Sequence, residues 1–232
     1  MSVPEAAAGP TSSVDAAAAA AEDAVRAGIV TAVGPLFYAR GFTTVGMDEV
    51  RAVAGVSLKR LYRLFPSKED LIEQVLLGWR EDWETNIVAQ VESAQVPRDR
   101  LLAVFDFLAA WFTSEGFRGC AFINSFGELS GTSGRIGAIV RAQKAEFQDY
   151  LARVAAGTGA PASLAPQLAI LAEGAVTTAA ISASPEPARQ ARAAAEILID
   201  VALGTRPNPR QGSDSQEDTP RAGSAVSTVP TG

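Results

Sequence analysis

The chain has 232 residues, 47% of them hydrophobic, and a formal net charge of -6, so it can bury a core as one large domain or two small ones. Histidine is absent, which removes the commonest general base and metal ligand and argues against hydrolytic triads and most zinc sites. The single cysteine, Cys120, excludes an internal disulfide and fits a reducing compartment.

The two ends of the chain differ in composition from its middle. Residues 1–21 are low in complexity and in large apolar groups, and residues 205–232 are rich in Pro, Gly, Ser and Thr, so we expect two disordered tails. The N-terminus lacks the basic start and compact apolar run of a signal peptide. No uninterrupted apolar stretch reaches the length of a membrane span. The sequence therefore predicts a soluble, cytoplasmic protein without a membrane partner.

The residues between the tails show helical periodicity throughout, with no alternating strand pattern and no internal repeat. The first helix spans about residues 22–40. Pro35 inside it predicts a kink, and Gly41 ends it. Two short helices follow, at residues 47–54 and 58–64.

Serine caps mark the start of the second short helix and of the long helix that follows it. Ser57 precedes the first of them. Ser67 precedes the second, where Asp70 completes a capping box. This long helix extends to about Ser93. Five more helices are expected before a stop at Gly204, near residues 98–113, 119–129, 133–156, 164–183 and 186–203.

The stretch from Ser57 to Lys68 concentrates positive charge, with four cations and no acid in an otherwise acidic chain. On a helical wheel Lys59, Arg60 and Arg63 share one face, and the large apolar side chains lie opposite. Cations in the first turn of a helix are unfavourable unless an anion binds there, because that end already carries partial positive charge. The charge alone is equally consistent with a basic face that is merely solvated. The surrounding sequence pattern therefore has to distinguish a solvated face from an anion-binding one.

The surrounding pattern is a helix-turn-helix, with a Gly-containing turn between two short helices, the second of which enters the DNA major groove in this motif. Residues 29–76 resemble the DNA-binding domain of the TetR/AcrR transcriptional regulators. The features that carry the resemblance are, in chain order, Leu36-Phe37, Gly41-Phe42, Ala54-Gly55-Val56-Ser57, Leu61-Tyr62, Phe65 and Ser67-Lys68-Glu69.

The resemblance implies that the short helix after Ser57 is a recognition helix for double-stranded DNA. It assigns groove and phosphate contacts to Lys59, Arg60, Tyr62 and Arg63, and phosphate contacts to Ser57, Lys68 and the backbone N–H groups near Gly46 and Met47. Tyr62 has core packing as a competing role. The family's common Lys-Gly-Thr after the serine is Leu58-Lys59-Arg60 here, and because arginine pairs well with guanine, G-rich half-sites are expected.

The second part of the chain is rich in aromatic residues, with eleven of the sixteen between residues 79 and 150. Most of them are expected in the core, but a helical bundle can also contain an apolar ligand pocket. The segment 117–129 resembles part of the family's ligand domains, and Asn124 in it is either a pocket group or a satisfied core amide. Nothing near Cys120 in the sequence predicts a reactive thiol. The predicted pocket residues are Trp83, Phe107, Trp111, Phe122, Asn124, Phe126 and Tyr150.

The last two helices are apolar or small almost all the way round, which indicates cover on both sides. One side can pack on the chain's own bundle, and the other needs a second chain. The predicted seam of a four-helix dimer interface consists of Leu168, Leu171, Ala175, Thr178, Ala191, Ala195, Leu198 and Val201. The resemblance implies the same mode of dimerisation, and a two-fold homodimer requires a palindromic operator.

The sequence therefore predicts an all-α homodimer with about nine helices in each chain. Residues 22–66 are expected to form a three-helix DNA-binding domain with the helix-turn-helix, and residues 67–204 a helical ligand-binding and dimerisation domain. The predicted function is a transcriptional repressor that a small apolar effector releases from its operator. The alternatives are a small-molecule-binding or scaffold dimer that no longer reads DNA, and an enzyme. Without histidine, clustered carboxylates or a phosphate-binding glycine loop, we expect no catalytic site, no metal and no cofactor.

Overall fold

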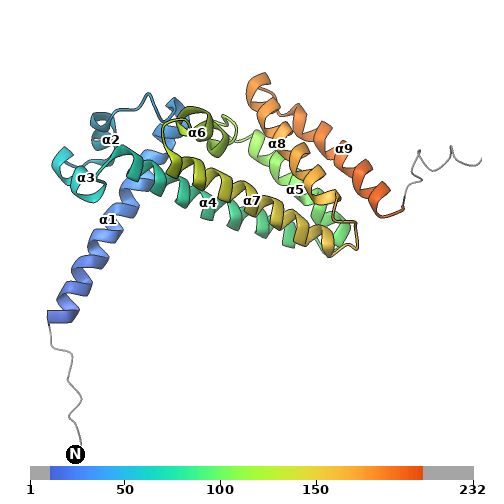
Figure 1. The fold of residues 1–232 in the computed structure, drawn as a ribbon, viewed down its shortest axis with the longest axis horizontal. Coiled ribbons are helices and arrows are strands. Elements are labelled where there is room, and N and C mark those ends of the chain that lie inside the picture. The colour runs from blue at the N-terminus through green and yellow to red at the C-terminus, as the bar shows by residue number, and fades with distance from the viewer. Residues whose placement is uncertain (1–10, 206–232) are drawn as a thin grey trace, which may run out of the picture.

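The computed structural model describes residues 11–205, which form nine α-helices and no strand (Figure 1). The helices are α1 (Thr11–Arg40), α2 (Met47–Ala54), α3 (Leu58–Leu64), α4 (Lys68–Glu92), α5 (Pro97–Phe112), α6 (Ala121–Leu129), α7 (Gly134–Ala156), α8 (Leu164–Ser182) and α9 (Glu186–Ala202). The predicted all-α fold class is confirmed, and the helices after the first begin and end within two residues of their predicted bounds.

The first helix is longer than predicted. It begins at Thr11, so residues 11–21, which were expected to belong to a disordered tail, are helical. Residues 16–21 are all alanine, the residue with the highest helix propensity, so the composition that suggested disorder also favours a helix. The helix continues through Pro35. Residues 1–10 and 206–232, the rest of the two predicted tails, lie outside the described residues.

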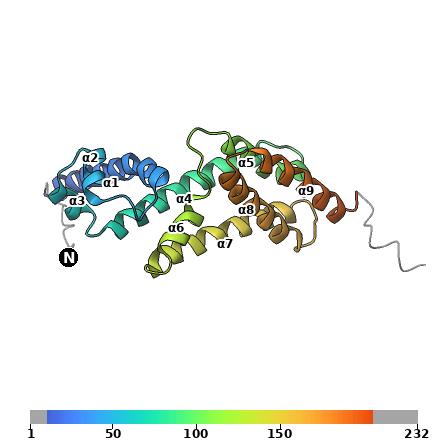
Figure 2. The same ribbon diagram turned by 90° about the horizontal axis from the view of Figure 1, so that it is seen from above.

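The helices gather in two groups that α4 connects. α1, α2 and α3 lie together at one end of the molecule, and α5, α8 and α9 lie at the other (Figures 1 and 2). α4 runs from the first group to the second and packs on α1, α5 and α7 along its way. A displacement of α4 therefore affects both groups.

Buried side chains of α3 and of the residue after it anchor this helix to the core of the first group. Phe37 and Phe42 stack with ring centroids 5.7 Å apart, and Trp79 of α4 meets Phe42 edge-on at 6.2 Å. Leu61 in α3 and Phe65 directly after it are both 0% exposed. Each such side chain stabilises the fold by about 1.5–3 kcal/mol. These contacts hold the short helix α3 in place with its opposite face free.

One helix corrects an expectation from the sequence. By length and composition α8 would be able to cross a membrane, whereas the sequence was judged to hold no such stretch. In the structure α8 packs on α7 and α9 and buries Leu168, Ala172 and Ala175 against them. A helix packed in a protein core can have the same length and apolar composition as a membrane-spanning helix.

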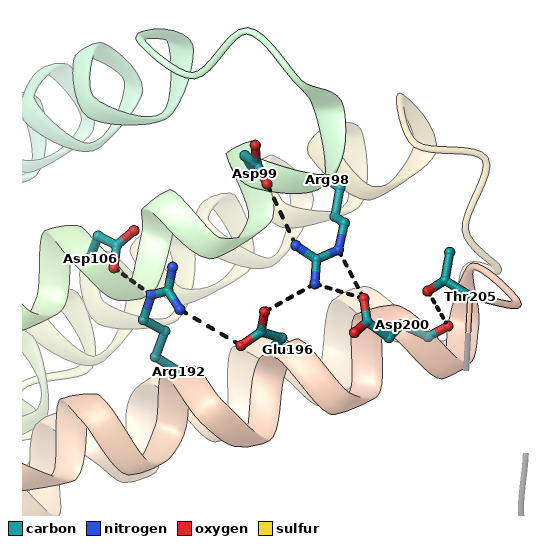
Figure 3. A network of polar contacts seen from close by, with 7 residues as sticks. All are labelled: Arg98, Asp99, Asp106, Arg192, Glu196, Asp200 and Thr205. Carbon is teal, nitrogen blue, oxygen red and sulfur yellow. Dashed lines mark hydrogen bonds and ion pairs between the residues drawn. The ribbon is translucent and has the colours of Figure 1, made fainter. Parts of the chain in front are cut away.

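A network of ion pairs ties α9 to α5 (Figure 3). Arg98 donates to the Asp200 carboxylate at 2.7 and 2.8 Å and to Glu196 at 3.2 Å. Arg192 donates to Asp106 at 2.6 Å. The hydrogen bonds to Asp200 and then to Glu196 raise the pKa of Arg98 above its ordinary value. The network fixes α9 along α5, and with it the outer face that α9 shares with α8.

Candidate nucleic-acid interface and internal cavity

α2 and α3 form a helix-turn-helix through a turn that requires glycine. Gly55 ends α2 with a φ of 65°, a left-handed conformation that a Cβ disfavours. Ser57 then caps α3, because its hydroxyl oxygen accepts a hydrogen bond from the backbone N–H of Arg60 at 3.2 Å. Both caps are the ones that the sequence predicts, and they set the direction of α3 relative to α2.

α3 turns Leu61 and Leu64 to the core and its cations to solvent, while Leu58 at its start is exposed. Leu61 and Leu64 are 0% and 2% exposed. The other exposed side chains are Lys59, Arg60, Tyr62 and Arg63. The first turn of α3 contains no acidic residue, so its own turn does not neutralise these cations. Of the three cations, only Arg63 has an ion-pair partner among the residues that the structure describes. This partner is Glu22 of α1, at 3.8 Å. The free face of α3 is therefore a cationic surface with one aromatic ring.

The other predicted DNA contacts are partly engaged within the chain. The Lys68 ammonium donates to the backbone oxygen of Thr43 at 3.2 Å, and partial burial lowers its pKa. The backbone N–H of Gly46 donates to the Glu49 carboxylate at 3.4 Å, and Met47 packs against the core. A DNA phosphate at the start of α2 would have to displace the Glu49 carboxylate from this N–H.

Known proteins share this architecture. The sequence profile of the bacterial regulatory proteins of the tetR family matches residues 31–75, from the second half of α1 into α4. A TetR-family transcriptional regulator from Streptomyces coelicolor matches with a TM-score of 0.73 at 26% identity, covering 85% of this chain and 98% of its own. A protein of Streptomyces avermitilis assigned to the TetR regulators matches with a TM-score of 0.68 at 26% identity, covering 77% of this chain and 97% of its own.

The chain belongs to the TetR family. Curated protein sequences contain no match to it. The helix-turn-helix of this TetR-family chain makes it a DNA-binding transcriptional regulator. The resemblance drawn from the residues between Leu36 and Glu69 is thereby confirmed.

This TetR-family protein has a cavity of about 800 Å³ lined by residues of α1, α4, α5, α6, α7 and α8, a size that suits a small organic ligand. Four of the seven predicted pocket residues line it, namely Trp83, Phe107, Trp111 and Phe122. The other three do not. Asn124 lines a separate hollow near Thr43, Phe126 is 42% exposed, and Tyr150 lies in a small hollow on another side of Trp83.

The cavity is also lined by residues that the sequence did not predict. Pro35 and Tyr38 of α1 reach it from the DNA-binding end, and Trp79 of α4 lines it beside them. A Cβ on Gly34 would lie 3.2 Å from the Trp79 ring, so this glycine lets α1 approach α4 closely. A signal for this wall exists in the sequence, because four large or polar residues recur at helical spacing on one face of α4. They are Trp79, Trp83, Asn86 and Gln90.

Besides Asn86 and Gln90, the cavity wall contains a partly buried polar cluster around Lys144. The Lys144 ammonium lies 2.8 Å from a Glu173 oxygen and 3.3 Å from the sulfur of Cys120. Burial opposes the charge on Lys144, but the neighbouring Cys120 and Glu173 outweigh burial, so its pKa is raised. Gln143 is 4% exposed, and its Oε1 has no hydrogen-bond partner within residues 11–205.

Two contacts join the cavity region to the DNA-binding end through α6. The Tyr38 hydroxyl donates to the backbone oxygen of Gly119 at 2.7 Å and accepts from the N–H of Arg118 at 2.9 Å. Near the other end of α6, the Glu128 carboxylate accepts from the backbone N–H and the hydroxyl of Thr43, at 2.8 and 3.0 Å. α6 is thus held to α1 at one end and to the loop before α2 at the other.

The predicted dimer seam is partly wrong. Leu168, Ala175, Ala191 and Ala195 are at most 5% exposed inside the chain's own core, so they cannot contact a second chain. For Leu168 and Ala175 the reason is that α8 is apolar on both faces, so helical periodicity alone does not say which face packs inward. Leu171, Leu198 and Val201 are half-buried, and Thr178 is exposed as predicted.

The outer face of α8 and α9 carries other apolar side chains. Ile170 is 74% exposed, Ile181 is 83% exposed and Ile197 is 50% exposed. Ile170 and Ile181 stand on one side of α8 together with Gly174, Thr177 and Thr178, which are also exposed. We call this set, with Ile197 of α9, the outer isoleucine face.

Proposed function

We propose that this TetR-family regulator is a cytoplasmic repressor that leaves a palindromic operator when a small apolar effector fills the cavity. Residues 22–66 bind the operator, and residues 67–204 bind the effector and the second chain. The continuity of α4 carries this proposal. Lys68 in its first turn contacts the loop before α2, while Trp79 and Trp83 on the same helix line the cavity.

The proposed DNA surface centres on α3. Lys59, Arg60 and Arg63 contact bases and phosphates, and the exposed Tyr62 ring lies among them. The remaining proposed contacts are made to phosphates by Ser57, Lys68 and the N–H groups near Gly46 and Met47. Charge supports this choice, because residues 22–80 carry eight cations against seven acids, whereas residues 81–204 carry nine against fourteen.

The proposed homodimer forms through the outer isoleucine face. Two chains that bury this face against each other build a four-helix interface from α8 and α9 of each chain, with the half-buried Leu171, Leu198 and Val201 at its edge. A two-fold axis then repeats α3, and two recognition helices related in this way fit a palindromic operator.

The proposed release is a shift in population between two conformations. An effector that binds one conformation better changes operator affinity by the same coupling free energy, typically about 1–3 kcal/mol, or roughly 5- to 150-fold. The contacts of α6 offer a route for this coupling. Tyr38 lines the cavity and is bonded to the loop before α6, and Glu128 on α6 holds Thr43 before α2.

Selection of bound fragments from random DNA, followed by a ligand screen against the selected site, tests this function. We expect a palindromic site that the protein releases when an apolar ligand binds. All three tryptophans of the chain line the cavity, so quenching of intrinsic fluorescence reports binding there. Failure to select any sequence would favour the scaffold dimer, and ligands that quench fluorescence without lowering operator affinity would remove the effector-released repressor.

A further inference from the structure

We propose that Leu58 contacts the C5-methyl group of thymine in the operator, beside the bases that the cations of α3 contact. This deepens the proposed function, because it rests on α3 as the DNA-binding surface and names a base that this surface selects. The starting observation is that two large side chains with apolar surface lie open on α3. Leu58, its first residue, is 36% exposed, and Tyr62, one turn later, is 45% exposed. Water does not favour an exposed leucine, so a partner that covers it adds to the free energy of binding.

Exposed apolar side chains gather at surfaces where we propose partners. Eight large ones are exposed in the part of the chain that the structure describes. Three of them form the outer isoleucine face, and three others, Val53, Leu58 and Tyr62, lie in the helix-turn-helix. Single scattered apolar residues are normal on a protein surface, whereas a group of them marks an interaction site. Because this regulator binds DNA through its helix-turn-helix, the partner that we infer for Leu58 is double-stranded DNA.

The free face of α3 has an apolar strip beside its cations. At about 100° per residue, Leu58 and Tyr62 point within about 40° of each other, and so do Lys59 and Arg63. Residues four positions apart are neighbours on a helix surface, with Cβ atoms about 5–6 Å apart. Leu58 and Tyr62 therefore form one continuous strip, which we call the α3 apolar strip, along one side of the cationic pair.

Thymine presents the one large apolar group among the base edges of the major groove. Its C5-methyl lies beside an O4 acceptor, whereas the other bases present hydrogen-bond donors and acceptors. Leucine has no donor and no acceptor, so a polar base edge buried against it loses water without compensation. Burial of a methyl group against it is favourable instead. Leu58 therefore favours thymine over the other three bases.

The position of Leu58 in α3 directs it to the bases. In a helix-turn-helix the N-terminal residues of the second helix contact base edges, and Leu58 is the first residue of α3. The Ser57 hydroxyl caps the N–H of Arg60 at 3.2 Å, which fixes the backbone on both sides of Leu58. The α3 apolar strip spans about 6 Å, from four residues at a rise of about 1.5 Å, compared with about 3.4 Å for one base pair. It covers at most two neighbouring base pairs, so each half-site should contain thymine next to the guanine expected for arginine.

The size of the effect follows from the area of one methyl group. Replacing thymine by deoxyuridine removes this group and keeps the base pair. The loss of one buried carbon group should weaken binding about fourfold in one half-site. A palindrome repeats the contact, so substitution in both half-sites should weaken binding about sixteenfold. The salt dependence should stay the same, because no phosphate contact is lost.

The test uses the full chain and the palindromic duplex obtained by in vitro selection, labelled with fluorescein for anisotropy titrations. Each thymine of the half-site is replaced in turn by deoxyuridine, in both halves of the duplex. The wild type is compared with Leu58→Ala. Val96→Ala is the control, because Val96 is 53% exposed but lies in the segment between α4 and α5. Alanine is a better helix former than leucine, so Leu58→Ala should fold, and circular dichroism checks this.

We expect deoxyuridine at one position, or at two neighbouring ones, to weaken binding by the wild type and by Val96→Ala about sixteenfold. Leu58→Ala should bind the thymine duplex as weakly as the wild type binds the deoxyuridine duplex, and should not distinguish the two duplexes. Its slope of log affinity against log salt should equal that of the wild type. A merely structural role for Leu58 would displace the cations of α3, change this slope and leave the deoxyuridine effect in place.

The inference is wrong if the selected half-site has no thymine, if the wild type binds both duplexes equally, or if folded Leu58→Ala keeps the deoxyuridine effect. The proposed function fails in a different way. Selection of no sequence at all would remove DNA recognition by α3 and the role of Leu58 together. A selected palindrome that binds independently of its thymine methyl groups leaves the operator-binding regulator intact and removes only the role of Leu58.

Discussion

Replacing Ile181 by serine should dissociate the homodimer without unfolding the chain. Ile181 is 83% exposed on the outer isoleucine face, whereas Leu168 of the same helix is 0% exposed. Ile181 is therefore available to a second chain, and Leu168 is not. Variants at these two residues distinguish the proposed interface from the seam that helical periodicity alone suggested.

The size of the effect follows from the exposed area. Full burial of an isoleucine contributes about 1.5–3 kcal/mol, and 83% of this residue is still exposed in the single chain. A dimer that covers it gains roughly 1.2–2.5 kcal/mol for each copy. The two-fold axis doubles this to roughly 2.5–5 kcal/mol, so the dissociation constant should rise by roughly 60-fold to 4,000-fold.

Sedimentation equilibrium over a dilution series measures this constant, with Val53→Ser on α2 as the control. Val53 is 49% exposed and lies in the DNA-binding end, so its replacement should leave the dimer unchanged. Leu168→Ser should instead lower the free energy of unfolding by about 2–5 kcal/mol, because it removes a buried side chain. An Ile181→Ser variant that dimerises like the wild type would refute the proposed interface.

Three further predictions concern single contacts. Ser57→Ala removes the cap of α3 and should lower the free energy of unfolding by about 1 kcal/mol, measured as a melting temperature lower by about 2–4 °C together with weaker operator binding; an unchanged melting temperature would contradict it. Glu128→Gln weakens the bonds to Thr43 and should reduce the effector's influence on operator affinity roughly fivefold, since hydrogen bonds to a charged group contribute about 1.5–3 kcal/mol and partial exposure lowers this. Hydrogen bonds from Ser67 and Arg135 lower the pKa of Asp70, so its contribution to stability is present above the ordinary carboxyl pKa and is lost as pH falls through the lowered one. Urea titrations of the wild type and Asp70→Asn should therefore converge at acid pH, and a constant difference would contradict this.

Local features of the fold were readable because their cause lies within a few residues. Gly55 and Ser57 bound the turn before α3, and Ser67 with Asp70 bounds the start of α4, as the sequence indicated. Capping depends on a side chain and a backbone group at most three positions apart. The same holds for the cationic face of α3, which a helical wheel of seven residues determines.

The cavity was only half predictable because its walls come from distant parts of the chain. Aromatic content pointed to Trp83 and Trp111, but no local pattern brings Tyr38 or Lys144 to the same space as Cys120. Lys144 lies 24 positions from Cys120 in the chain, so no local pattern predicts their contact. Tertiary packing determines which distant residues come into contact, and helical periodicity in a single sequence does not encode it. Tertiary packing also determines which face of α8 is exposed.

The most direct measurement of the central claim is the salt dependence of operator binding for a Lys59→Ala, Arg60→Ala, Arg63→Ala triple variant. If α3 lies on DNA, fluorescence anisotropy should show weaker binding by the triple variant. The slope of log affinity against log salt should also be shallower by up to about three, because each lost phosphate contact removes about one. Arg153→Ala on the exposed surface of α7 should leave both affinity and slope unchanged. A folded triple variant that binds the operator with the affinity and slope of the wild type would contradict the account.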